Sequence, residues 1–85
     1  MSTQASNKKS KFPKKIFMDV SPATSGVQLR ALLEHYYGEV NYVTIHTGYG
    51  DRTMAFVGFR WHEDAVVALE GLNGSFLDGM VLHPQ

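Results

Sequence analysis

The stretch that decides the fold is residues 51–59, which read Asp-Arg-Thr-Met-Ala-Phe-Val-Gly-Phe. Side chains of a β-strand alternate between the two faces of its sheet. One face therefore receives an arginine, a methionine and an aromatic ring, namely Arg52, Met54 and Phe56. The other face receives three apolar side chains, namely Ala55, Val57 and Phe59. The second face suits a core, whereas the first suits the stacking of flat, anionic ligands such as single-stranded nucleic acid.

The length and the cysteine count bound the class of protein. The chain has 85 residues, which is enough for one small domain, and it contains no cysteine. Disulfides and thiolate metal sites are thereby excluded, which fits a reducing intracellular compartment, the nucleus or cytoplasm rather than an organelle. We expect no signal peptide and no membrane partner, because no apolar run is long enough to span a bilayer.

The net charge of zero hides an asymmetry along the chain. All the lysines lie in the first fifteen residues, which contain no acidic residue: Lys8, Lys9, Lys11, Lys14 and Lys15. From residue 16 onward there are three arginines and eight acidic residues, so the two parts carry +5 and −5. A basic arm on an acidic body indicates either a nucleic-acid-binding tail or a solvated leader, and the sequence leaves both open.

The periodicity of the apolar residues predicts the order of the elements. We interpret residues 1–14, rich in Ser, Asn and Lys, as a disordered basic tail, and residues 15–85 as the folded domain. Strands are predicted at 16–20, 40–47, 52–59 and 80–83, with helices at 25–37 and about 63–72. This β-α-β-β-α-β order is the ferredoxin-like α+β layout. It predicts a four-stranded antiparallel sheet with both helices on one face and the other face open.

Four stretches of the sequence match a known family. Residues 16–21 read Ile-Phe-Met-Asp-Val-Ser, with an aromatic at the second place, and residues 52–59 read Arg-Thr-Met-Ala-Phe-Val-Gly-Phe. Leu-Asn-Gly at 72–74 and Leu-Asp-Gly at 77–79 fit the second helix and following loop of the same family. In this order, residues 15–85 resemble an RNA recognition motif (RRM) domain. The resemblance implies single-stranded RNA as the partner.

The resemblance also implies roles for residues of the open face. Phe17 and Phe56 occupy the places where the family stacks bases, and Arg52 resembles the basic residue that pairs with a phosphate. Met54 departs from the pattern, because the family prefers a second aromatic ring there and methionine offers no ring for stacking. Asp19 places a carboxylate beside Phe17, where it either repels phosphate or accepts a hydrogen bond from a base amino group.

Other candidates follow from position alone. Alternation along the second strand directs Val43 and Ile45 to the core. The same alternation puts three side chains on the open face: Tyr42, Thr44 and His46. The last strand adds His83, the start of the domain adds Lys14 and Lys15, and Tyr49 is expected at the tip of a glycine-rich hairpin. We expect these residues to contribute less to RNA binding than the two phenylalanines.

The sequence contains no recognisable catalytic or metal-binding motif. The four histidines have no metal-ligand spacing: His35, His46, His62 and His83. No Ser-His-Asp or acid-pair arrangement stands out, and Gly-Tyr-Gly at 48–50 lacks the lysine of a phosphate-binding loop. We therefore expect no metal, no cofactor and no enzyme activity.

Two functions stay open at this stage. The first is a single-stranded RNA-binding module of modest affinity, aided by the basic arm. The second is an interaction domain on the same fold with little or no RNA binding of its own, which the acidic body, Asp19 and Met54 favour. Peptide-binding relatives use an acidic first helix and an Arg-x-Phe loop, whereas this helix has one acid, Glu34, and residues 74–76 read Gly-Ser-Phe. Both functions admit other proteins of an RNA-processing assembly as partners.

Overall fold

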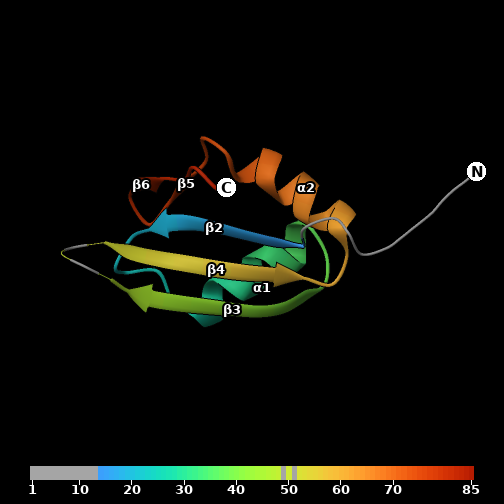
Figure 1. Cartoon of the computed structure of the whole chain (residues 1–85). Coiled ribbons are helices and arrows are strands. Elements are labelled where there is room, and N and C mark those ends of the chain that lie inside the picture. The colour runs from blue at the N-terminus through green and yellow to red at the C-terminus, as the bar shows by residue number, and fades with distance from the viewer. Residues whose placement is uncertain (1–13, 49, 51) are drawn as a thin grey trace, which may run out of the picture.

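A computed structural model describes residues 14–48, 50 and 52–85 (Figure 1). In chain order the elements are β2 (Lys15–Val20), α1 (Gly26–Tyr36), β3 (Val40–Thr47), β4 (Thr53–Phe59), α2 (His62–Leu72), β5 (Phe76–Leu77) and β6 (Met80–Val81). The predicted α+β layout of two helices and antiparallel strands is confirmed. Residues 1–13 of the expected tail and Tyr49 of the expected hairpin tip lie outside the described residues.

The central strand of the sheet is β4. Both β2 and β3 pair with it in antiparallel fashion, in the order β2-β4-β3. Helix α1 packs against β3, and α2 packs against β2 and β4. Figure 1 shows α1 passing behind the three strands. Buried residues of both helices and all three strands form one cluster, so the helices cover the same face, and no described element covers the other.

Alternation along the strands explains which face is buried. In β2, Ile16 and Met18 are buried while Phe17 between them is exposed. The core is completed by Val20 of β2 and by side chains from the rest of the domain: Leu29, Leu33, Val40, Ala55, Val57, Phe59, Ala65, Ala68, Leu72 and Leu82. Burying one large apolar side chain contributes about 1.5–3 kcal/mol. The stability of the fold therefore comes chiefly from this one face.

The ends of the helices are set by local chemistry. Ser25 caps α1, and its side chain accepts a hydrogen bond from the backbone N–H of Gln28 at 3.3 Å. After α1 the chain turns at Gly38, whose φ is 130° and whose position leaves no room for a Cβ beside the carboxylate of Asp64. Glu63 and Asp64 lie in the first turn of α2, where acidic side chains are favoured by the helix dipole.

An extra residue interrupts β3 near its start. Val40 pairs with the last residue of β4 and Tyr42 pairs with the residue before it, so Asn41 is a bulge. The bulge shifts the alternation, because Val40 is buried and Tyr42, two residues later, is exposed. Two side chains of α1 form hydrogen bonds with the backbone of Val40. Nη2 of Arg30 donates to the Val40 carbonyl at 2.8 Å, and the Val40 N–H donates to the carboxylate of Glu34 at 3.5 Å.

The end of the chain differs from the strand predicted at 80–83. Instead of pairing with β2, β6 pairs with β5 in a short hairpin. Its turn is Asp78-Gly79, with φ of 51° and 84°, and two consecutive positive φ values are the signature of a type I′ turn. Beyond the hairpin the chain reaches the edge of β2, where Phe17 and Gln85 exchange two backbone hydrogen bonds of 2.8 Å. The fourth position of the sheet is therefore held by one antiparallel pair.

Candidate nucleic-acid interface

The register of the sheet arranges the predicted site residues in three rows across the open face. The middle row contains Phe17, Phe56 and Thr44. The Met54 row contains Asp19, Met54 and His46. The Gly58 row contains Lys15, Gly58 and Tyr42. Because β4 supplies the centre of every row, the central strand is the axis of the candidate site.

Phe17 and Phe56 form a stacked pair at the centre of the face. Their ring centroids are 6.1 Å apart and their planes meet at 26°. The backbone of Phe17 bonds to Gln85 on its other side, so it faces Phe56 in a non-hydrogen-bonded pair, where side chains approach most closely. His46 adds its ring to Phe56 at 5.3 Å and 87°, an edge-to-face contact. Phe17 and Phe56 remain 40% and 37% exposed, which leaves them accessible to a flat ligand.

Arg52 and Asp19 form an ion pair beside these rings. Nη2 of Arg52 lies 2.9 and 3.1 Å from the two carboxylate oxygens of Asp19. Arg52, which is expected to contact phosphate, is thus paired with Asp19, the carboxylate that is expected to repel phosphate on this face. The two side chains are 65% and 42% exposed, and an exposed pair of this kind contributes about 0–1 kcal/mol. A phosphate can therefore replace Asp19 as the partner of Arg52 at little cost.

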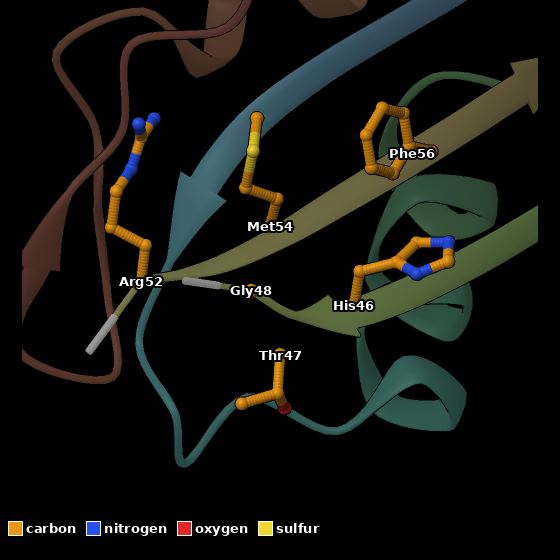
Figure 2. A pocket seen from close by; sticks show the side chains of 6 residues that line it. All are labelled: His46, Thr47, Gly48, Arg52, Met54 and Phe56. Carbon is orange, nitrogen blue, oxygen red and sulfur yellow. The ribbon is translucent and has the colours of Figure 1, made fainter. Parts of the chain in front are cut away.

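A hollow of about 560 Å³ lies next to the Met54 row. Six residues line it: His46, Thr47, Gly48, Arg52, Met54 and Phe56 (Figure 2). Figure 2 shows Arg52, Met54 and Phe56 rising from the β4 side and His46 rising from β3. The hollow combines the guanidinium of Arg52, the imidazole of His46 and an apolar wall. The apolar wall suits a base or sugar, and the guanidinium suits a phosphate at the rim.

The remaining predicted residues lie at the margins of the face. His83 lines a smaller hollow of about 150 Å³ that also includes Asp19, and its Nδ1 lies 3.4 Å from Oδ1 of Asn73. Lys15 is exposed at the end of the Gly58 row. Lys14 precedes β2 and is half-buried, and its place in the alternation is that of the buried residues of β2. Lys14 therefore does not share the open face with Lys15.

Gly58 was not among the residues expected to shape the site. A Cβ at this position would lie 2.6 Å from Cζ and 2.7 Å from Cδ2 of Tyr42, closer than real side chains approach. The absence of a side chain at Gly58 therefore lets the ring of Tyr42 lie across β4. A glycine inside an apolar strand often marks such a close approach, so the signal was present in the sequence.

The part of the chain that the structure describes has neither a metal-binding cluster nor a membrane-spanning helix. No group of three or more His, Cys, Asp or Glu among residues 14–48, 50 and 52–85 could hold a metal ion. In the same part of the chain, neither helix has the length and apolar character needed to cross a membrane.

Comparison with known proteins identifies the family of this fold. The family model described as RNA recognition motif matches residues 19–83. Among solved structures, the RRM3 domain of Mip6 has a TM-score of 0.76 at 18% identity, over 85% of this chain and 90% of that chain. The N-terminal RNA-binding domain of a hypothetical protein has a TM-score of 0.75 at 25% identity, over 91% and 81%. The Rna15 RRM with bound RNA gives 0.71 at 22% identity, over 86% and 81%. None of the curated proteins matches the chain significantly.

Proposed function

The chain belongs to the RNA recognition motif family, a family of non-catalytic RNA-binding modules, and we propose that this member binds single-stranded RNA on the open face of its sheet. The observation that carries the proposal is the exposed, stacked pair of Phe17 and Phe56 on the face that neither helix covers. Two structures of similar fold, the Rna15 RRM with bound RNA and the SXL-lethal protein/RNA complex, contain RNA, which supports RNA as the ligand of this chain.

The two rings set the scale of the affinity. One stacked base contributes about 1–3 kcal/mol, so two bases contribute about 2–6 kcal/mol. The upper value corresponds to a dissociation constant of roughly tens of micromolar. Other groups must add to it: Arg52 contacts a phosphate after releasing Asp19, and the polar side chains of β3 line the path of the RNA. The module is therefore one of modest affinity.

The basic N-terminal arm supplies further phosphate contacts in this proposal. If all five lysines of residues 1–15 engage phosphates, the slope of log affinity against log salt concentration approaches about −3.5 for a single strand. Removing residues 1–13 deletes three of these lysines and should reduce the slope by about 2. An unchanged slope in the shortened chain would show that the arm is a solvated leader.

The decisive experiment replaces both Phe17 and Phe56 by alanine. Fluorescence anisotropy with a randomised single-stranded RNA pool should show that binding is abolished, because both stacking surfaces are removed. Tyr36→Ala is the matched control, since Tyr36 is an aromatic residue on α1 that is 68% exposed and lies away from the sheet face. Circular dichroism checks that each variant is folded. Wild-type affinity in the double variant would refute binding on the sheet face.

A second function, protein interaction through the helical side, is favoured by one observation. A hollow of about 200 Å³ lies between the helices and β5, and Tyr36 and Phe76 at its rim are 68% and 71% exposed. Chemical-shift mapping with a short single-stranded RNA separates the two functions. Shifts along β2 and β4 support RNA binding on the sheet. Shifts confined to the tail, or absent, favour the interaction domain.

A further inference from the structure

The Gly58 row contains an aromatic ring that lies on the sheet. A Cβ on Gly58 would contact Cε2 of Tyr42, and the two carbons that flank Cε2 would be nearly as close, at 2.6 and 2.7 Å. A Cβ beside the edge of the ring would be clearly farther from the two flanking carbons than from the nearest one. The similar distances therefore mean that Gly58 lies under the face of the Tyr42 ring. Tyr42 is 37% exposed, the same fraction as Phe56 in the middle row. The side of the ring that does not rest on β4 is therefore open to a ligand.

The two outer rows of the open face offer different chemistry. In the Met54 row, the central residue has no ring, and Asp19 is occupied by Arg52. In the Gly58 row, Tyr42 offers a ring, and Lys15 lies at the opposite end with an exposed side chain. An ammonium within the same row as a stacking ring can neutralise the phosphate that accompanies a stacked base. The Gly58 row thus has both components of a nucleotide contact.

We infer that Tyr42 is the third stacking surface of the domain and that the RNA extends from Phe17 and Phe56 over the Gly58 row, with Lys15 at its phosphate. This inference rests on the proposed RNA binding and adds to it a residue and a direction. It also assigns a role to Gly58, which positions the ring without contacting RNA. The extension leads toward Lys14, the residue at which the basic arm joins the fold.

The test measures the gain in affinity from a third nucleotide. NMR titrations of the full chain with mixed-sequence RNA dinucleotides and trinucleotides give both affinities. Trinucleotides with an abasic residue at the 5′ or the 3′ end report which terminal base is stacked. In the wild-type protein, the third nucleotide should raise the affinity about 5- to 150-fold, the range of one stacked base, and an abasic residue at one end should remove the gain.

Three variants separate stacking from a purely structural role. Tyr42→Ala should remove the gain from the third nucleotide and leave the dinucleotide affinity unchanged, whereas Tyr42→Phe should retain the gain, because only the ring is needed. Gly58→Ala should also remove the gain, since the new methyl group displaces the ring while alanine is well tolerated in a strand. Tyr36→Ala on α1 is the control and should behave as wild type.

The outcomes distinguish this inference from the proposed function. If the gain persists in Tyr42→Ala and Gly58→Ala, the inference is overturned while RNA binding on the sheet stands. It is equally overturned if Tyr42→Ala lowers the affinities for dinucleotides and trinucleotides by the same factor. The loss would then not depend on the third nucleotide, and Tyr42 would affect binding only by supporting the structure of the sheet. If the double alanine variant of Phe17 and Phe56 binds dinucleotides like the wild type, the proposed function fails and the inference fails with it.

Discussion

Phe56 and Phe59 lie three residues apart on β4, and their surroundings are opposite. Phe59 is 1% exposed and belongs to the core under both helices, whereas Phe56 is 37% exposed and contacts Phe17 and His46. The residue type is the same, so the difference comes only from which face of the strand each side chain occupies. The comparison shows that the face without helices keeps large apolar rings that folding does not bury. Their exposure contributes little to stability and is what the proposed stacking of RNA bases requires.

The largest effect in this comparison is expected from Phe59→Ala. Removing a fully buried phenylalanine costs about 3–5 kcal/mol of unfolding free energy, a large share of what a small domain has. Phe56→Ala should cost less, about 1–3 kcal/mol, because the 37% exposed ring loses its aromatic contacts and only part of the burial of a core phenylalanine. Urea unfolding followed by circular dichroism measures both. Equal losses would contradict the division of β4 into a stabilising face and a binding face.

The reverse ranking is expected for RNA affinity. Phe56→Ala should weaken binding of single-stranded RNA by about 1–3 kcal/mol, because one base loses its stacking surface. Isothermal titration calorimetry provides the measurement, and Phe76→Ala is a suitable control, since Phe76 is 71% exposed on β5 and lies outside the three rows. A comparable loss in the control would move the binding site to the helical side.

A smaller gain is expected from Met54→Phe. This change supplies the ring that the family prefers at this place, next to Phe56 on the same face. Met54 is partly exposed and lies between Asp19 and His46, so a ring can be accommodated at the surface. We expect RNA affinity to rise by about 1 kcal/mol, the lower end of the range for a stacked base, with little change in unfolding midpoint. Weaker binding would mean that the sulfur side chain itself contacts RNA.

The smallest effect is expected from Asp19→Asn. The change frees Arg52 and removes a negative charge from the face, so RNA affinity should rise by a few tenths to about 1 kcal/mol, the scale of an exposed ion pair. Glu39→Gln is the matched control, because it breaks another exposed pair, Arg60–Glu39 at 3.3 Å, outside the three rows. Lower affinity in Asp19→Asn would instead assign Asp19 as an acceptor for a base.

The sequence predicted the elements better than the contacts between them. The bounds of β3 at 40–47 are confirmed, and so is the exposure of Tyr42 on it. The ion pair of Asp19 with Arg52 could not be predicted, because it joins residues far apart in the chain through the register of two strands. Local sequence does not encode that register, and the covering of Gly58 by Tyr42 depends on it in the same way.

The strand predicted at 80–83 was wrong for a different reason. Asp78-Gly79 is a strong local signal for a two-residue hairpin turn, and the structure has that turn between β5 and β6. The prediction of a strand at 80–83 followed the order of elements in the family-like layout and gave this local signal too little weight. The turn could therefore be predicted from the sequence, but the expected order of elements was given more weight than the local Asp-Gly signal.

The bulge at Asn41 adds one residue to β3 without changing the faces of the residues on either side of it. Val40 is held to α1 and the core, while the residues after the bulge present their polar side chains to the open face. If Asn41 were deleted, Val40 and Tyr42 would become consecutive residues opposite Phe59 and Gly58, and every later side chain of the strand would keep its face. A deletion at a later position of β3 would instead move the side chains beyond it to the opposite face, so Asn41 is the position of this strand at which the loss of a residue leaves the open face unchanged.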